Sequence, residues 1–214
     1  MPCFVFDFGR VLFSWQPEKL LQHVLPRRAT DAASAAFWVD QVFQSYGGDW
    51  GEFDRGMVTP DQLVQRIAGR TGLPAAEVQA VVSAGPHWLL PIPATVDLLT
   101  RLRQGGRPMF YLSNMPAPFA DHLERTHPVV GQFDAGVFSA RVNLIKPDPA
   151  IFDLAAQRFG LPPSELVFLD DHPANVAAAQ AAGWRALLFS DAAQAERDLR
   201  QAGWWPQARQ RPKN

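Results

Sequence analysis

The chain has 214 residues, enough for one α/β domain with an insertion, and 47% are hydrophobic, which argues against wholesale disorder. Its net charge of -1 argues against binding nucleic acid through bulk charge, and its single cysteine, Cys3, allows no internal disulfide. We find no basic leader segment and no apolar stretch long enough to span a bilayer. We therefore expect a cytoplasmic protein that contacts neither nucleic acid nor membrane.

Short apolar runs predict the strands of a sheet. The runs cover residues 3–6, 109–112, 166–169 and 186–189. Continuous runs of this length are typical of strands that are covered on both faces. Helical patterns separate the runs, and a glycine ends each of them. Strands alternating with helices predict an α/β fold, namely a Rossmann-like, doubly wound parallel sheet.

Residues 16–90 interrupt this alternation and read as helices without a clear strand. Thr59-Pro60, for example, is typical of a helix start. We expect a helical cap over residues 16–90, inserted after the first strand into a core formed by residues 1–15 and 91–205. A plainer alternative is that these helices simply pack on the sheet. The polar residues 206–214 are expected to form a flexible tail.

Polar residues follow three of the apolar runs, and parallel strands bring such residues to one edge of the sheet. Asp7 follows the first run, where its carboxylate either accepts backbone hydrogen bonds or binds a metal and acts as a covalent nucleophile. Asp170-Asp171 follows the third run. Adjacent carboxylates repel unless a cation such as Mg²⁺ offsets their charge, although either could instead cap the following helix.

Two weaker signals complete the pattern. Ser113-Asn114 follows the second run and could hold a phosphate oxygen, or serve only as a turn. Lys146 lies in the proline-rich segment Ile145-Lys146-Pro147-Asp148-Pro149 and could place a positive charge over a phosphoryl group, or be merely solvated.

The order of these motifs along the chain resembles that of the haloacid-dehalogenase-like hydrolases. The resemblance covers nearly the whole chain, including the helical insertion, which lies where many members of the family carry a cap. It rests on the segments Val5-Phe6-Asp7-Phe8-Gly9-Arg10-Val11-Leu12, Tyr111-Leu112-Ser113-Asn114, Ile145-Lys146-Pro147-Asp148-Pro149-Ala150-Ile151-Phe152 and Val167-Phe168-Leu169-Asp170-Asp171-His172-Pro173-Ala174-Asn175.

The resemblance implies an enzyme that hydrolyses phosphoric monoesters with Mg²⁺. Asp7 would attack phosphorus and form an aspartyl-phosphate, with Ser113 and Lys146 holding the transferring phosphoryl group. Mg²⁺ would be bound by Asp7, Asp171 and the Gly9 carbonyl. Supporting residues would be Asp170 and Asn175, and further substrate contacts are expected from Gly9, Arg10, Asn114 and Arg55.

One position departs from the family pattern. Most phosphatases of the family have a second Asp two residues after the nucleophile, where this chain has Gly9, and glycine does no acid–base work. A subgroup with glycine there resembles α-glucose-1-phosphate phosphatases, which favours a small sugar phosphate as substrate. His172, Glu52 or Asp54 could otherwise replace the missing group.

Two alternatives remain open. The 2-haloacid dehalogenases of the family also lack the second Asp and use no metal, but Asp170-Asp171 would place uncompensated negative charge beside their anionic substrate. A non-catalytic protein that binds a phosphorylated metabolite is the other alternative. In the cap, Trp15, Trp50, Phe53 and Arg55 are either substrate contacts or cap core. The sequence makes no prediction of oligomeric state.

Overall fold

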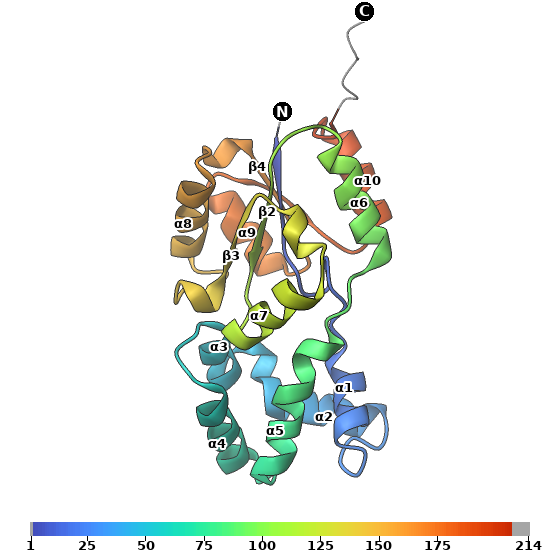
Figure 1. The fold of residues 1–214 in the computed structure, drawn as a ribbon, viewed down its shortest axis with the longest axis vertical. Coiled ribbons are helices and arrows are strands. Elements are labelled where there is room, and N and C mark those ends of the chain that lie inside the picture. Colours follow the sequence, from blue (N-terminus) through green and yellow to red (C-terminus); the bar gives the residue numbers. More distant parts are fainter. Residues whose placement is uncertain (1, 207–214) are drawn as a thin grey trace, which may run out of the picture.

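The computed structural model describes residues 2–206 and has a five-stranded parallel sheet in the order β3-β2-β1-β4-β5 (Figure 1). The strands are β1 (Cys3–Phe6), β2 (Met109–Ser113), β3 (Ala135–Phe138), β4 (Leu166–Asp170) and β5 (Arg185–Leu188). The α-helices are α1 (Pro17–Val24), α2 (Ala32–Phe43), α3 (Gly48–Asp54), α4 (Pro60–Thr71), α5 (Ala75–Ala84), α6 (Pro93–Arg103), α7 (Ala117–Thr126), α8 (Pro149–Phe159), α9 (Pro173–Ala181) and α10 (Ala192–Gln201). Short 3₁₀ helices are η1 (Gln44–Tyr46), η2 (Gly85–Trp88), η3 (Val130–Gln132), η4 (Ser139–Arg141) and η5 (Pro163–Glu165).

Both faces of the sheet are buried, which confirms the predicted α/β fold class. Along β1, Phe4 and Phe6 pack into the apolar cluster that includes residues of α6 and α10. Cys3 and Val5, which point the other way, pack into a second cluster with residues of α8 and α9. Alternating side chains of one strand thus enter two cores, as the period of a strand requires.

The strand order places the catalytic candidates at one edge. From β1 the chain builds β2 and β3 on one side, then crosses to build β4 and β5 on the other. Ligands bind in such sheets beyond the carboxyl ends of the strands, where the order reverses. Asp7 follows the central strand β1, so it lies between the ends of β2 and β4.

One strand was absent from the sequence prediction. β3 pairs with β2 at the edge of the sheet, and its Ala135-Gly136 start carries little hydrophobic signal. Gly136 is required there because a Cβ would lie 2.2 Å from the ring of Tyr111. The last strand also begins at Arg185, one residue before the predicted run of residues 186–189.

Helices α1 to α5 lie together at one end of the molecule, where the insertion was expected (Figure 1). The chain enters and leaves this helical cap side by side. Ser14 N donates to Leu90 O at 2.8 Å and Ile92 N donates to Leu12 O at 2.9 Å. The boundaries at residues 16 and 90 remain a prediction.

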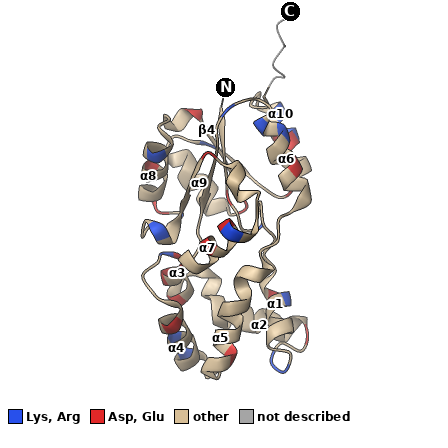
Figure 2. Ribbon diagram, viewed as in Figure 1, with Lys and Arg blue, Asp and Glu red and all other residues tan. Residues whose placement is uncertain are grey.

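Charges of both signs are distributed over the helices of core and cap (Figure 2). Positive charge for an anionic ligand must therefore come from individual side chains. No helix among residues 2–206 combines the length and hydropathy needed to cross a membrane. Of the predicted flexible tail, Pro206 is buried and residues 207–214 lie outside the described part of the chain.

Candidate active site

Lys146 connects the ends of two strands. Its Nζ lies 2.9 Å from Asp7 Oδ1 and 2.6 Å from Asp170 Oδ2. All three residues are buried, with 3%, 7% and 0% of their surface exposed, respectively. A buried ammonium group in contact with two carboxylates is stable only because its charge is offset on both sides.

Asn114 positions Lys146 through the backbone. The Asn114 amide oxygen accepts from Lys146 N at 2.8 Å, and its Nδ2 donates to Lys146 O at 2.9 Å. Because Asn114 directly follows β2, this pair of bonds fixes the Lys146 segment to the end of the sheet. The structure thus gives Asn114 a positioning contact in addition to its place in the wall of the cavity.

Asp170 is fully engaged by protein groups. Oδ1 accepts from His172 N at 2.8 Å, Oδ2 contacts Lys146, and Asn175 Nδ2 lies 3.0 and 3.1 Å from the two oxygens. Its carboxylate therefore orients Lys146 and the start of α9. The supporting role of Asp170 and Asn175 in metal binding stays a prediction.

A group of oxygen atoms could hold a metal ion. Asp7, Asp170 and Asp171 each offer a carboxylate oxygen, and these atoms lie within 4.8 Å of one another. Because both oxygens of Asp170 already accept hydrogen bonds from protein groups, the carboxylates that could bind a metal ion are those of Asp7 and Asp171. Within residues 2–206 no hydrogen bond reaches the Gly9 carbonyl, and Gly9 lines the same cavity. Two carboxylates and a carbonyl suit Mg²⁺, which keeps water ligands as well.

Burial and repulsion between carboxylates disfavour the ionised forms of Asp7 and Asp171. Burial, assisted by the charges of Asp170 and Asp171, raises the pKa of Asp7 to about 7 despite the attraction of Lys146. Burial and the charge of Asp170 also raise the pKa of Asp171. Burial alone would lower the pKa of Lys146, but attraction by Asp170 and Asp7 outweighs it and raises that pKa. A divalent cation would relieve the excess negative charge.

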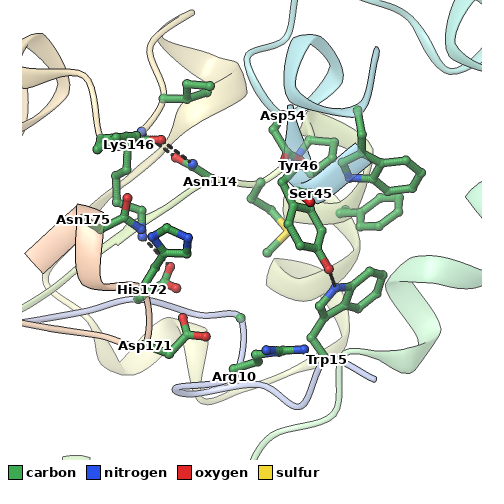
Figure 3. Close-up of a pocket in the computed structure, with 18 of the residues that line it drawn as sticks. Arg10, Trp15, Ser45, Tyr46, Asp54, Asn114, Lys146, Asp171, His172 and Asn175 are labelled. Carbon is green, nitrogen blue, oxygen red and sulfur yellow. Dashed lines mark hydrogen bonds and ion pairs between the residues drawn. The ribbon is translucent and has the colours of Figure 1, made fainter. Parts of the chain in front are cut away.

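Two further side chains are available to an anion. Ser113 is 1% exposed, and its Oγ finds no hydrogen-bond partner among the described residues. An unpartnered buried hydroxyl is unusual and is explained where a ligand supplies the partner. Arg10 lines the cavity, and within residues 2–206 its guanidinium makes no hydrogen bond or ion pair. Figure 3 shows Arg10 beside Asp171 on the floor of the cavity.

A cavity of about 390 Å³ extends from this charged edge to the cap. Its far wall is largely aromatic and aliphatic, and Figure 3 shows Trp15 and Tyr46 there, facing the charged residues. The Trp15 Nε1 donates to the Tyr46 hydroxyl. Apolar members of the wall are Trp15, Trp50, Leu89, Met115 and Phe119.

The structure separates the predicted site residues into two groups. Most lie together, since the cavity is lined by Asp7, Gly9, Arg10, Asn114, Lys146, Asp171 and Asn175. Ser113 and Asp170 are buried at the ends of β2 and β4 and are not among the lining residues. Arg55 is not among the lining residues and its Nε lies 3.7 Å from Glu52 Oε1. Its neighbour Asp54 lines the cavity instead. The sequence also gave no indication of Tyr46, Leu89, Met115 or Phe119, whose only signal is a position beside a glycine- or proline-rich loop.

The family follows from a match over most of the chain. A model of the haloacid dehalogenase-like hydrolases matches residues 3–183. The chain belongs to this family. It is therefore a hydrolase, as the resemblance of its motifs implied.

Individual relatives agree with this assignment. Over 197 residues, the chain is 29% identical to sesquiterpene phosphatase astK of Aspergillus oryzae, covering 92% of this chain and 94% of that protein. A family enzyme of Bacteroides thetaiotaomicron, crystallised with magnesium and inorganic phosphate, has a TM-score of 0.70 at 21% identity, over 89% of this chain and 95% of that one. An L-2-haloacid dehalogenase has a TM-score of 0.65 at 22% identity, over 89% of this chain and 85% of that one. The fold alone thus does not separate phosphatase from dehalogenase among haloacid dehalogenase-like hydrolases.

Proposed function

We propose that this hydrolase is a Mg²⁺-dependent phosphatase that cleaves a small phosphomonoester through an aspartyl-phosphate on Asp7. The observation that carries the proposal is the pair of contacts from Lys146 Nζ to Asp7 and Asp170, beside the carboxylate of Asp171. A carboxylate nucleophile needs a nearby positive charge when it approaches an anionic phosphoryl group. Lys146 supplies one such charge and orients the Asp7 carboxylate.

Asp7, Asp171 and the Gly9 carbonyl would hold Mg²⁺. When bound there, the ion would add positive charge between the nucleophile and the phosphoryl oxygens. The excess of carboxylates over ammonium groups supports this donor set. In the part of the chain that the structure describes, Lys146 is the one cationic side chain in contact with the three acidic residues, and it contacts only Asp7 and Asp170.

Ser113, Arg10 and Lys146 would hold the phosphoryl oxygens. The buried Ser113 hydroxyl has no hydrogen-bond partner among residues 2–206, and Arg10 offers a planar group suited to phosphate. In the first step, an Asp7 oxygen forms a bond to phosphorus as the bond to the leaving oxygen breaks. In the second step, water attacks phosphorus, which releases phosphate and regenerates the carboxylate.

The opposite wall of the cavity selects the organic part of the substrate. Its aromatic and aliphatic side chains favour a largely apolar group over the sugar phosphate expected from the sequence. The similarity to a sesquiterpene phosphatase supports the same preference. We therefore propose an alkyl or isoprenoid monophosphate as the class of substrate.

Dehalogenation receives no support from the charges of the site. A 2-haloacid is itself an anion, and here it would approach three clustered acidic residues with one contacting lysine. Release of halide from a 2-haloacid in excess chelator would reverse this assignment. Saturable binding of a phosphorylated ligand without turnover would instead indicate a binding protein.

The deciding experiment measures phosphate release from an alkyl phosphate, an isoprenoid monophosphate, a sugar 1-phosphate and an aryl phosphate, with Mg²⁺ and with chelator. We expect release that depends on Mg²⁺ and that Asp7→Asn lowers by at least about 1000-fold, since it removes the nucleophile. The matched control is Asp97→Asn, because Asp97 is exposed on α6, away from the cavity. Full activity of Asp7→Asn would overturn the proposal.

A further inference from the structure

Gly9 leaves a gap in the proton chemistry of the site. A Cβ at Gly9 would meet no atom within 4 Å, so neither a side chain nor a neighbour fills the position two residues after Asp7. The other acidic groups at the sheet edge are committed, since Asp170 is hydrogen-bonded and Asp171 is a metal ligand in the proposed function. A proton for the leaving oxygen must therefore come from another part of the cavity.

The cap provides a carboxyl group that faces this cavity. Asp54 is the last residue of α3, lines the cavity and is 6% exposed. Within residues 2–206, no hydrogen bond or ion pair reaches its carboxyl oxygens. Figure 3 shows Asp54 on the cap side, across the cavity from Lys146 and Asn114.

Contacts with the core hold the backbone at Asp54 in place. Ser139 Oγ donates to Asp54 O and accepts from Met115 N, the latter at 2.8 Å. Asn143 Nδ2 donates to the carbonyl of the next residue, Arg55, at 3.1 Å. At Gly56, a Cβ would lie 2.4 Å from Ala140 O, so the two backbones touch. These contacts fix the backbone that carries the Asp54 carboxyl group relative to the core.

The surroundings favour a protonated Asp54. Burial, and then the negative charge of Asp7, raise the pKa of Asp54 to about 8 against the opposing effect of Lys146. Burial, with a smaller effect from the negative charge of Asp54, raises the pKa of the neighbouring Tyr46. A carboxyl group that retains its proton near neutral pH is suited to general acid catalysis.

We propose that Asp54 is the catalytic general acid and base of this enzyme, in place of the group absent at Gly9. The inference rests on the proposed phosphatase function. As Asp7 attacks phosphorus and the ester bond breaks, the Asp54 carboxyl proton passes to the leaving oxygen, which departs as an alcohol. The Asp54 carboxylate then accepts a proton from the water that attacks the aspartyl-phosphate, and release of phosphate returns both residues to their starting states.

The two other residues considered from the sequence do not have this placement. His172 lines the cavity but is exposed to solvent, so bulk water competes with it as a proton carrier. Glu52 lies outside the cavity lining, near Arg55. Glu52→Gln on the same helix as Asp54 therefore serves as the matched control for loss of a cap carboxylate.

The test compares two substrates that differ in their need for a proton. An alkyl phosphate has a poor leaving group, whereas p-nitrophenyl phosphate has a good one that departs without protonation. For Asp54→Asn we expect kcat/KM to fall at least about 100-fold with the alkyl phosphate and less than about 10-fold with the aryl phosphate, because acid catalysis contributes only where the leaving group needs it. Glu52→Gln should show the wild-type ratio between the substrates.

A second measurement follows the covalent intermediate. Asp54→Asn lacks the base for the hydrolysis step. With p-nitrophenyl phosphate it should therefore release a burst of p-nitrophenolate and accumulate phosphorylated protein, detected by intact mass. Gly9→Asp has space for its side chain and should restore at least about tenfold of the lost alkyl phosphate activity in the Asp54→Asn protein.

The outcomes distinguish the two proposals. Equal loss on both substrates, no accumulated phosphoenzyme, and no rescue by Gly9→Asp would overturn the role of Asp54 while leaving the phosphatase intact. Unchanged activity of Asp54→Asn would do the same. Absence of phosphate release by the wild-type protein from every substrate would overturn the proposed function and, with it, the role of Asp54.

Discussion

The charged edge of the sheet and the cap wall of the cavity are held by different kinds of contact. At the sheet edge, Lys146 contacts Asp7 and Asp170, and Asn114 fixes the Lys146 backbone with two hydrogen bonds. On the cap side, Trp15 packs edge-on against Phe43 and donates to Tyr46, which belongs to a left-handed segment. Replacing one group at the sheet edge should therefore abolish chemistry, whereas replacing one in the cap wall should change substrate preference.

The left-handed segment explains part of this difference. Gln44, Ser45 and Tyr46 have φ values of 49°, 52° and 61°, which cost a residue with a Cβ about 1 kcal/mol each. Strain of this kind persists at ligand sites because surrounding contacts compensate for it. The cap wall therefore keeps its conformation despite unfavourable backbone dihedral angles. The residues at the sheet edge, in contrast, are positioned by the ends of hydrogen-bonded strands.

The largest combined effect on stability and turnover is expected from Lys146→Met. It leaves buried carboxylates without their counter-charge, so we expect a loss of about 3–5 kcal/mol in the free energy of unfolding and at least about 100-fold in kcat. Urea unfolding and phosphate release measure the two losses, with Lys19→Met at an exposed position of α1 as control. A stability loss below about 1 kcal/mol would show that the sheet edge does not depend on this charge.

The next effect is a pH dependence of stability that arises at the cap. The pKa of Asp54 is about 8 in the folded protein, above its ordinary value of 3.8, so folding takes up a proton between these values. The stabilisation from this proton is complete below pH 3.8 and is lost as pH rises through 8. Relative to wild type, Asp54→Asn should therefore gain stability between pH 4 and 9, on the order of a few kcal/mol. Unfolding at several pH values without metal tests this, with Asp97→Asn as control; a constant difference would contradict it.

Two buried serines are expected to differ in role, since Ser113 should affect catalysis and Ser139 should affect stability. Ser113 Oγ has no protein partner in the described residues, so Ser113→Ala should lower kcat/KM about 10- to 100-fold without lowering the free energy of unfolding. Ser139 Oγ connects Asp54 O to Met115 N, so Ser139→Ala should cost about 1–3 kcal/mol in stability. Steady-state kinetics and thermal unfolding of both variants provide the comparison. Equal stability losses would argue that Ser113 is structural.

The smallest effect is expected in the cap wall. Trp15→Ala removes an aromatic side chain from the cavity and should raise KM about 5- to 10-fold for an isoprenoid monophosphate, consistent with loss of partly buried apolar contact. The value of kcat for p-nitrophenyl phosphate should stay within about twofold, since the sheet edge is untouched. A fall in kcat with no change in KM would indicate that the cap wall acts on the chemical step.

The sequence was most informative where chemistry follows directly from a strand. Asp7, Ser113 and Asp170 each come at the end of a buried apolar run, and parallel pairing brings such ends together. The sequence did not predict the edge strand β3, because Gly136 has no hydrophobic side chain and instead leaves space for the ring of Tyr111. Its hydrophobic signal was correspondingly weak.

The cap was less predictable because orientation decides which residue faces the cavity. Arg55 was expected to contact substrate, yet Asp54 lines the cavity, and neighbouring positions on a helix point about 100° apart. No local pattern specifies that rotation, which the contacts of Asp54 with Ser139 and of Gly56 with Ala140 of the core determine. Tyr46 of the cap and Phe119 of α7 line one cavity only because cap and core pack together.

The paired segments at the entrance and exit of the cap have a consequence for how such a protein diversifies. Leu12 to Ser14 and Leu90 to Ile92 form a short antiparallel ladder, so the two ends of the insertion are adjacent. The cap is thus an insertion whose two ends meet at a fixed point beside the sheet. Each doubling of the length of such an insertion raises the free-energy cost of closing it by only about 0.6 kcal/mol. Insertions of different size can therefore be exchanged at this point without altering strand register, so the lineage can acquire new substrates while retaining the same reaction centre.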